Sequence, residues 1–207
     1  MIEILSVSGS PVEGASTDIL LNALGRAVID CLPAGTRAVN RFIKLNALNF
    51  IPCQACGQAP ENGFCLYDDD LTGVYNQLFV CDCLLFGTPV YFDSVSAQAK
   101  AFIDRCNCFR PADFKNVNPE HDFIQKMTRT RPGAMVLVGG KRGWFEGARR
   151  TVAGYFKWLD ITNEGMLVYK SDDFTRKGAA SNDMAILEEV RRLGSKLAGV
   201  VMRNRRV

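Results

Sequence analysis

Histidine is almost missing from this chain, which has one, His121, among 207 residues. His121 lies beside Asp122 in a polar stretch, where we expect a surface side chain, and no His/Asp/Ser constellation accompanies it. Long apolar runs are missing too, because none approaches the roughly 18 residues that a membrane span requires. The sequence therefore predicts neither a nucleophilic triad nor a membrane-spanning protein.

A large charge of either sign is also lacking. The 25 lysine and arginine residues and 22 acidic residues give a formal net charge of +3. The densest basic stretch, Arg203-Asn204-Arg205-Arg206, is too short for a nucleic-acid surface, so we expect no nucleic-acid partner. The first residues lack the charged region, apolar core and cleavage site of a signal peptide. We therefore expect a cytoplasmic protein.

The first 30 residues are organised as a strand, a loop and a helix. The apolar run in Ile2–Val7 predicts a strand buried on both faces, and Ser8-Gly9-Ser10-Pro11 ends it. Apolar residues at helical spacing then predict a helix over Asp18–Ile29, with Ser16 or Thr17 as its N-terminal cap.

The loop between them, Ser8–Thr17, lacks both the lysine of a nucleotide-triphosphate loop and the glycine pattern of a dinucleotide fingerprint. It offers backbone N–H groups, the positive end of a helix dipole and the hydroxyls of Ser8, Ser10, Ser16 and Thr17. Such neutral donors suit a single phosphate monoester. The alternative is a strand-to-helix turn that binds nothing.

The rest of the chain continues this alternation. We expect further strands over Thr36–Leu45, Cys83–Gly87, Ala134–Val138 and Gly165–Tyr169. We expect further helices over Leu71–Val80, Ser94–Cys106, Glu146–Leu159 and Asn182–Met202. This alternation predicts one α/β domain over residues 1–207, with a parallel sheet covered on both faces. Residues 46–70 form an irregular loop with three cysteines, and residues 110–131 form a polar excursion.

Ligands of such open sheets bind beyond the carboxyl ends of the strands. Three loops lie there: Ser8–Thr17, Thr88–Ser94 and Gly139–Gly147. The second offers the flat side chains of Tyr91 and Phe92, and the third is rich in glycine, which lets a backbone approach a planar ligand. A phosphate cradle beside these walls predicts a phosphorylated flat ring as ligand, and FMN fits best.

The chain has eight cysteines, which without a secretory signal indicate reduced thiols or metal chemistry rather than disulfides. Three of them occupy apolar positions and are expected to behave as buried small hydrophobes: Cys81, Cys83 and Cys106.

Two charged clusters are expected to be structural. In Asp68-Asp69-Asp70, Asp69 or Asp70 caps the following helix rather than binding a hard metal. Asp104 and Arg105 are expected to form an ion pair. Four basic residues near the third loop suit either the 2′-phosphate of NADPH or a solvated basic face: Lys141, Arg142, Arg149 and Arg150.

Three stretches resemble a known family: SVSGSPVEGAST, PCQACGQAPENGFCLYDDD and GTPVYFDSVSAQAKAFIDR. They are similar to those of the NAD(P)H-dependent FMN reductases, in particular the iron–sulfur flavoprotein branch. The resemblance runs from Met1 to about Arg110 and continues more loosely through GGKRGWFEGARRTVAGYFKWLD. It implies a flavodoxin-like three-layer sandwich with a five-stranded parallel sheet in the order 2-1-3-4-5. It also implies a homodimer or homotetramer.

By the same resemblance, the phosphate of FMN contacts the first loop, and its ring contacts the second and third. The implied FMN-binding residues are Ser8, Ser10, Pro11, Ser16, Thr17, Thr88, Pro89, Val90, Tyr91, Phe92, Gly139 and Gly140. No catalytic side chain is expected, because the flavin carries the redox chemistry.

The predicted function is therefore that of an FMN-dependent oxidoreductase. It passes hydride from NAD(P)H to FMN and on to an unidentified acceptor: a quinone, a flavin, a metal ion or a small electrophile. One alternative is an iron–sulfur flavoprotein that carries electrons between protein partners. Another is a regulatory module on the same fold, with zinc or dithiol chemistry at its cysteine loop.

The cysteine loop departs from the pattern of that branch, C-x2-C-x2-C-x5-C. Cys53, Cys56 and Cys65 occupy its first, second and fourth positions, but Ala59 occupies the third. A [4Fe–4S] cluster normally takes four thiolates, so we do not expect one. The loop then holds either three inert thiols or a zinc site with a fourth ligand from elsewhere. The spacing selects no fourth sulfur among Cys31, Cys81, Cys83, Cys106 and Cys108.

Overall fold

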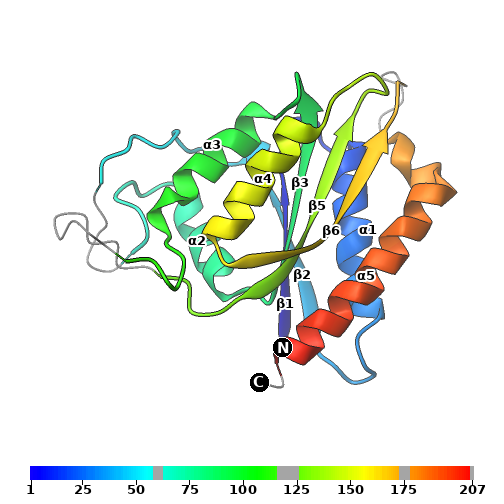
Figure 1. Ribbon diagram of the computed structural model, residues 1–207, viewed down its shortest axis with the longest axis horizontal. Coiled ribbons are helices and arrows are strands. Elements are labelled where there is room, and N and C mark those ends of the chain that lie inside the picture. The colour runs from blue at the N-terminus through cyan, green and yellow to red at the C-terminus, as the bar shows by residue number, and fades with distance from the viewer. Residues whose placement is uncertain (58–62, 116–125, 173–177, 206–207) are drawn as a thin grey trace.

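The computed structural model describes residues 1–57, 63–115, 126–172 and 178–205, and its fold is a three-layer α/β sandwich (Figure 1). Five strands pair in parallel in the order β2-β1-β3-β5-β6, which confirms the predicted order 2-1-3-4-5. Their bounds are Ile2–Ser8 (β1), Ala38–Lys44 (β2), Cys83–Tyr91 (β3), Arg131–Gly139 (β5) and Ile161–Lys170 (β6). Three residues singled out in the sequence lie outside the described ranges: Ala59, His121 and Asp122.

Helices cover both faces of the sheet (Figure 1). On one face α1 (Ser16–Asp30) packs against α5 (Met184–Asn204), and on the other lie α2 (Leu71–Val80), α3 (Ala97–Arg105) and α4 (Glu146–Trp158). All five were predicted, with ends that differ by a few residues. Short 3-10 turns add η1 (Leu45–Ala47), η2 (Cys106–Cys108) and η4 (Ala179–Asn182). In the described part of the chain, no helix has the length and apolar character needed to cross a membrane.

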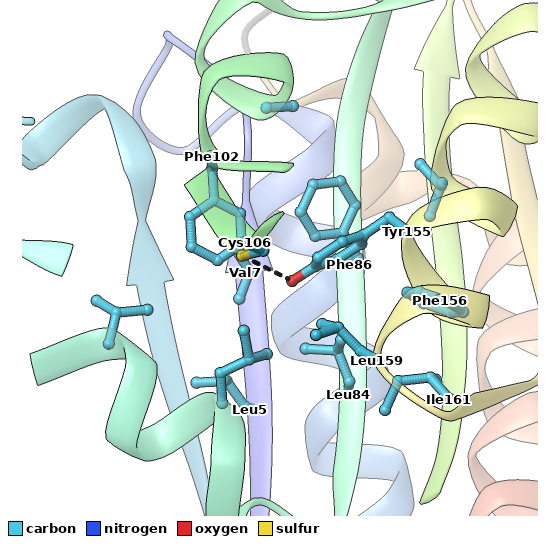
Figure 2. Packing of buried hydrophobic residues seen from close by; sticks show 14 of the residues in the cluster. Leu5, Val7, Leu84, Phe86, Phe102, Cys106, Tyr155, Phe156, Leu159 and Ile161 are labelled. Carbon is cyan, nitrogen blue, oxygen red and sulfur yellow. Dashed lines mark hydrogen bonds between the residues drawn. The ribbon is translucent and has the colours of Figure 1, made fainter. Parts of the chain in front are cut away.

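An apolar layer on each face of the sheet holds these elements together. The layer under α2, α3 and α4 includes Leu5, Phe86 and Tyr155, whose side chains are buried (Figure 2). Burying one such side chain contributes about 2 kcal/mol. Cys106 belongs to this layer and donates its thiol hydrogen to Tyr155 Oη at 3.8 Å (Figure 2). The predicted burial of three cysteines is confirmed for Cys81, Cys83 and Cys106.

The predicted cap of the first helix is wrong. The residue before α1 is Ala15, no side chain caps the helix, and Ser16 and Thr17 lie in its first turn. A contact with a distant segment explains the difference. Ser16 Oγ accepts the N–H of Ala180 at 3.2 Å and therefore binds η4 instead of its own helix. For α2, the sequence predicted that Asp69 or Asp70 caps the helix. Asp69 does so, since its Oδ1 accepts the N–H of Leu71 at 3.1 Å.

The helix predicted over Ser94–Cys106 begins later than expected. Ser94 and Val95 form β4, which pairs antiparallel with the end of β3, and β3 itself continues through the first four residues of the predicted Thr88–Ser94 loop to Tyr91. Ser96 then caps α3 by accepting the N–H of Ala99 at 3.2 Å. The hairpin turns the second loop into an extension of the sheet.

The predicted ion pair between Asp104 and Arg105 is also wrong. Arg105 is buried and binds both carboxylate oxygens of Asp69, at 2.7 and 3.2 Å, whereas Asp104 binds Lys100 on the surface at 2.7 Å. Adjacent residues on a helix point in different directions, so they seldom pair with each other.

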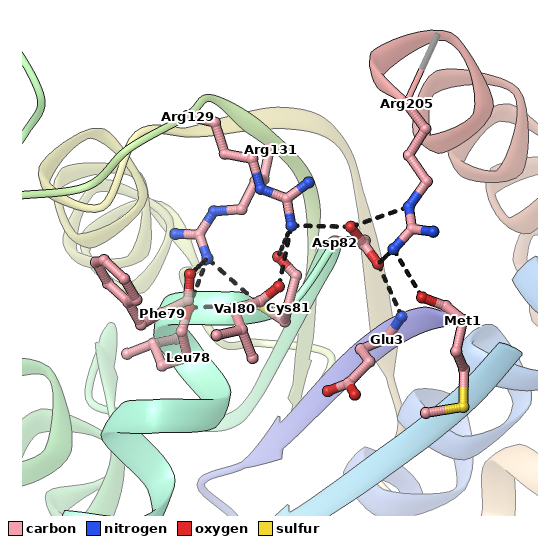
Figure 3. A network of polar contacts seen from close by, with 10 residues as sticks. All are labelled: Met1, Glu3, Leu78, Phe79, Val80, Cys81, Asp82, Arg129, Arg131 and Arg205. Atoms are coloured by element: carbon pink, nitrogen blue, oxygen red, sulfur yellow. Dashed lines mark hydrogen bonds and ion pairs between the residues drawn. The ribbon is translucent and has the colours of Figure 1, made fainter. Parts of the chain in front are cut away.

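A buried carboxylate joins distant parts of the chain at the amino end of the sheet. Asp82 is 4% exposed and accepts the N–H of Glu3 at 2.9 Å, Arg129 at 2.9 Å and Arg205 at 2.7 Å (Figure 3). Burial opposes its ionisation, but these three hydrogen bonds outweigh burial and lower the pKa of Asp82. Arg205 also donates to the carbonyl of Met1 at 2.7 Å, so the end of α5 is fastened beside the start of β1.

Candidate functional site

A cavity of about 550 Å³ lies at the carboxyl ends of β3, β5 and β6 and the start of α1. This is the edge of the sheet at which the sequence placed a ligand. Nine of the twelve predicted FMN-binding residues line it: Ser10, Ser16, Thr17, Pro89, Val90, Tyr91, Phe92, Gly139 and Gly140.

The remaining three predicted residues do not line this cavity. Ser8 is buried and donates its hydroxyl to the carboxylate of Asp18. Thr88 is buried and links β3 to the start of α3, since Oγ1 accepts the N–H of Ser96 at 3.0 Å. Pro11 is half-buried beside the cavity-lining Ser10. Ser8 and Thr88 therefore support the walls of the cavity from behind.

Seven lining residues were not predicted: Val12, Ala15, Val138, Tyr169, Ser171, Gly178 and Ala179. Tyr169 and Ser171 come from the carboxyl end of the last parallel strand. Ligands of open sheets bind beyond the carboxyl ends of their strands, so applying this rule to the last strand as well would have predicted both residues. Gly178 and Ala179 come from the segment before α5, and no local pattern places that segment against the first loop.

The first turn of α1 presents unpaired backbone donors at this cavity. The helix makes its first internal hydrogen bond from the N–H of Ile19 to the carbonyl of Ala15, at 3.1 Å. Within the described residues, the N–H groups of Ser16, Thr17 and Asp18 therefore have no acceptor. Unpaired N–H groups and the positive helix end together stabilise an anion.

A buried ion pair lies under the same loop. Lys44, the last residue of β2, places its Nζ 2.6 Å from Asp18 Oδ2 and 2.8 Å from the carbonyl of Val12. Asp18 also accepts the N–H of Gly14 at 2.9 Å. The loop has no lysine of its own, but the neighbouring strand supplies one, and its charge offsets that of Asp18 in the first turn of α1. The two residues are 26 positions apart, and no pattern in the sequence predicted their contact.

The second loop forms a tight aromatic turn. Tyr91 pairs with Ser94, and the two residues between them, Phe92 and Asp93, have φ values of 52° and 60°. Two left-handed residues are typical of a type I′ hairpin turn, which normally carries Asn or Gly. Phe92 is fully exposed and Tyr91 is 48% exposed, so both rings stand at the edge of the cavity.

Glycines of the third loop allow close contacts within the protein. A Cβ on Gly147 would lie 2.2 Å from the carbonyl oxygen of Asp93, and the N–H of Gly147 donates to Asp93 Oδ1 at 2.9 Å. A Cβ on Gly139 would lie 2.9 Å from the ring of Phe145. The sequence attributed these glycines to approach of a ligand, whereas at Gly147 the close approach is to the aromatic turn.

The basic residues near the third loop divide into two pairs. Arg149 and Arg150 both bind Glu146, at 2.6 and 2.8 Å, and these hydrogen bonds lower the pKa of Glu146 to about 2. Lys141 and Arg142 are exposed in the loop itself. The loop is anchored by the backbone N–H of Lys141, which donates to Asp172 at 2.7 Å.

Four thiols line a second cavity of about 230 Å³, which shares no lining residue with the first. Cys53, Cys56 and Cys65 come from the cysteine loop, and Cys108 comes from η2. Burial, and then repulsion from the nearby Cys65, raises the pKa of Cys108 to about 12. As the described residues are arranged, no three His, Cys, Asp or Glu side chains are gathered closely enough to hold a metal ion.

A model of the family described as NADPH-dependent FMN reductase matches residues 2–172. The chain belongs to this family. It is an FMN-dependent oxidoreductase, and the resemblance seen in its motifs is confirmed.

Two relatives of this chain are described as iron–sulfur flavoproteins. The chain is 28% identical over 214 residues to one from Methanocaldococcus jannaschii, which covers 97% of both chains. It is 29% identical over 167 residues to one from Methanosarcina thermophila, which covers 81% of this chain and 76% of the relative.

Solved structures confirm the flavodoxin-like fold of this chain. An archaeal flavodoxin matches with a TM-score of 0.56 and 13% identity, covering 97% of this chain and 99% of that one. RosB with bound 8-demethyl-8-formylriboflavin-5′-phosphate matches with a TM-score of 0.74 and 10% identity, covering 100% of this chain and 81% of that one. At these identities the likeness shows the fold alone.

Proposed function

We propose that the 550 Å³ cavity binds FMN and that the protein takes hydride from NADPH and delivers electrons to a quinone, a flavin, a metal ion or a small electrophile. The observation that carries this proposal is the set of unpaired N–H groups at the start of α1, which opens on that cavity in a chain of the FMN reductase family. The cavity lies within the roughly 300–1,000 Å³ of small-molecule sites. When bound, FMN supplies the hydride acceptance and the onward electron transfer.

At one end of the cavity, the first turn of α1 binds the phosphate. The N–H groups of Ser16 and Thr17 and the hydroxyl of Thr17 are donors for its oxygens. The hydroxyl of Ser10, which donates to the carbonyl of Val12 at 3.0 Å, would turn toward the phosphate to join them. The Asp18–Lys44 pair holds the loop in shape without adding net charge. A phosphate dianion is thus bound by dipoles and hydroxyls, as expected for a monoester.

At the other end, the aromatic turn and the third loop enclose the flat ring. Pro89 and Val90 on β3 and Gly139 and Gly140 at the end of β5 bring backbone close to the cavity, so N–H groups of the protein can lie along the ring edge. The ring of Tyr91, about half exposed, provides an apolar wall and leaves an approach for the nicotinamide of NADPH.

We place the 2′-phosphate of NADPH at Lys141 and Arg142 rather than at Arg149 and Arg150. The second pair already binds Glu146, whereas the first is exposed in the loop beside the cavity-lining Gly140. A phosphate at the second pair would have to compete with that carboxylate.

We also propose that the protein is a homodimer or homotetramer with the mouth of the cavity at the interface. Phe92 lines the cavity and is fully exposed, and Trp144, 78% exposed, lies in the third loop, which a hydrogen bond from Gly147 to Asp93 joins to the aromatic turn. Exposed aromatic side chains are enriched in interfaces between protein chains. Size-exclusion chromatography with light scattering would measure the assembly, and a monomer at micromolar concentration would contradict it.

Replacing Ser16 with glutamate tests the phosphate assignment. The carboxylate would occupy the anion site and repel the phosphate, while a negative charge in the first turn of α1 favours the helix itself. We expect FMN retention after gel filtration to fall at least tenfold, and the free energy of unfolding to fall by only about 1 kcal/mol, because the hydrogen bond from the N–H of Ala180 to Ser16 Oγ is lost. Ser195→Glu, on the exposed face of α5, adds the same charge far from the cavity and is the matched control. Full flavin retention in Ser16→Glu would contradict the assignment.

Anaerobic addition of NADPH to the FMN-loaded protein separates this function from that of an electron carrier. Rapid bleaching of the flavin absorbance supports the reductase. A flavin that resists both NADPH and NADH supports the second candidate, an electron carrier between protein partners. The thiol-lined cavity and the iron–sulfur flavoprotein relatives favour that candidate. A colourless protein with bound zinc would instead indicate a regulatory module.

A further inference from the structure

The aromatic turn between β3 and β4 has a backbone conformation that its residues do not favour. Phe92 and Asp93 have φ values of 52° and 60°, in the left-handed region that favours glycine. In the described part of the chain, they are the only two successive non-glycine residues with such φ values. Phe92 is fully exposed, so burial of its ring does not hold the turn in place. Another contact must hold it.

The carboxylate of Asp93 makes that contact with the start of α4. Its Oδ1 accepts the N–H of Gly147 at 2.9 Å, from a residue 54 positions further along the chain. The first internal bond of α4 runs from the N–H of Arg149 to the carbonyl of Phe145 at 2.9 Å, so the helix itself leaves the N–H of Gly147 unpaired. Phe145, the residue before α4, has no side-chain oxygen to cap it. Asp93 therefore caps α4 from the aromatic turn, with its negative charge at the positive end of the helix.

The same two residues are also packed backbone against backbone. A Cβ on Gly147 would lie 2.2 Å from the carbonyl oxygen of Asp93 and 3.1 Å from its Oδ2. The end of β3 and the start of α4 lie at the same edge of the sheet (Figure 1). The aromatic turn and the first turn of α4 thus form one unit at that edge.

The start of α4 also holds the third loop. The ring of Phe145 packs on the first glycine of that loop, since a Cβ on Gly139 would lie 2.9 Å from it and 3.5 Å from Cβ of Val90. On Phe145 the Nζ of Lys170 lies 5.1 Å from the centre of the ring. Gly139 and Val90 line the cavity proposed for FMN. The start of α4 therefore joins the two loops that form the ring end of this cavity.

We infer that Asp93 is the positioning residue of the cavity mouth. By capping α4, it holds Tyr91 and Phe92 in place against the Gly139–Gly147 loop, and it so sets the opening through which the nicotinamide of NADPH reaches the flavin. The inference rests on the proposed function of the cavity, whereas the contact between Asp93 and Gly147 does not. FMN is retained through its phosphate at the first turn of α1, so Asp93 acts on the approach of NADPH.

Two substitutions separate the hydrogen bond from the backbone conformation. Glycine and asparagine both tolerate a left-handed φ, so neither adds strain at position 93. Asp93→Gly removes the acceptor for the N–H of Gly147, whereas Asp93→Asn keeps an oxygen that can accept it. A difference between these two variants therefore reports the hydrogen bond.

Asp160 provides a matched control at the other end of the sheet. It also has a left-handed φ, 52°, and its Oδ2 accepts a backbone N–H, that of Ala112, at 2.7 Å. It precedes β6, a ten-residue strand that spans about 33 Å at about 3.3 Å per residue, and the cavity lies at the far end of that strand. Asp160→Gly thus removes the same kind of contact away from the cavity.

The experiment compares wild type, Asp93→Gly, Asp93→Asn and Asp160→Gly. Hydrogen exchange of the flavin-free proteins is followed by mass spectrometry over residues 88–95 and 139–148, and FMN affinity and NADPH kinetics are measured on the loaded proteins. We expect Asp93→Gly to speed exchange in both segments and to raise KM for NADPH, each at least tenfold. Its kcat and FMN affinity should stay within threefold of wild type. Asp93→Asn and Asp160→Gly should match wild type in both measurements.

The remaining outcomes contradict the inference. Wild-type exchange or KM in Asp93→Gly overturns it, as does Asp93→Asn that is as impaired as Asp93→Gly. Equal effects of Asp160→Gly would show a role in overall stability alone, and a tenfold loss of FMN affinity in Asp93→Gly would place the residue in flavin retention instead. If Asp93→Gly is unfolded by circular dichroism, the amides of wild type decide: slower exchange at Gly147 than at Glu146 supports the cap, and equal exchange overturns it.

Failure of the proposed function gives a different result. A wild type that holds no flavin, or whose flavin NADPH does not bleach, contradicts that function and the role of Asp93 toward NADPH. The exchange measurement uses flavin-free protein, so it still decides whether Asp93 joins the two loops.

Discussion

The Nζ of Lys44 lies 2.6 Å from Oδ2 of Asp18, and the two side chains are 15% and 7% exposed. One residue ends β2 and the other lies in the first turn of α1, so the pair fixes the Ser8–Thr17 loop against the edge strand of the sheet. Lys44 offsets the negative charge of Asp18, so the positive end of the α1 dipole remains available to a phosphate.

Replacing Lys44 with methionine should break this relationship. An uncompensated, nearly buried Asp18 would remain, and we expect the free energy of unfolding to fall by about 3 kcal/mol and FMN affinity to fall at least tenfold. Urea unfolding and flavin fluorescence titration measure the two effects. The double variant Asp18→Asn with Lys44→Met removes both charges and should recover part of each loss. A double variant no better than Lys44→Met alone would contradict the pairing.

Gly147→Ala should destabilise the protein and the third loop. The added Cβ would lie 2.2 Å from the backbone oxygen of Asp93, which cannot move without opening the β3–β4 turn. We expect a loss of about 2 kcal/mol by thermal unfolding. Gly154→Ala is the matched control, since it lies in the same helix with nothing within 4 Å and should stabilise α4 by about 1 kcal/mol. Equal effects of the two substitutions would refute the close contact.

Phe92→Gly should separate stability from function. Phe92 is fully exposed at a φ of 52°, so removal loses no burial and glycine suits the left-handed turn. We expect the free energy of unfolding to stay equal or rise by about 1 kcal/mol. FMN retention or oligomer formation should fall, because the exposed ring serves a ligand or a partner. A variant with wild-type flavin binding and assembly would show that the ring serves neither.

Asp82 should make the free energy of unfolding depend on pH in the acid range. Its hydrogen bonds from Glu3, Arg129 and Arg205 lower its pKa in the folded protein below the unfolded value, so its contribution is present above the unfolded pKa and is lost as pH falls through the folded pKa. Asp82→Asn should lower the free energy of unfolding by about 2 kcal/mol at pH 7 and flatten its decline in acid. Asp104→Asn, which removes an exposed pair with Lys100, should change little. Parallel acid curves for wild type and Asp82→Asn would rule out this role.

Local pattern in the sequence determined most of the fold. Apolar runs such as Ile4–Val7 and Leu84–Phe86 are buried on both faces, and helical periodicity located five helices, because burial and backbone geometry act over a few residues. The hydroxyl-rich loop and the aromatic turn likewise led to one edge of the sheet, since parallel strands end there together.

Contacts between distant segments were decided only by the tertiary structure. Ser16 pairs with Ala180 rather than capping its own helix, and Arg105 pairs with Asp69 rather than with its neighbour. Lys44 reaches the anion loop, and Cys108 reaches the thiol cavity, for the same reason. The free energy of these contacts depends on which surfaces the packed sheet and helices bring together, and sequence spacing carries no information about that.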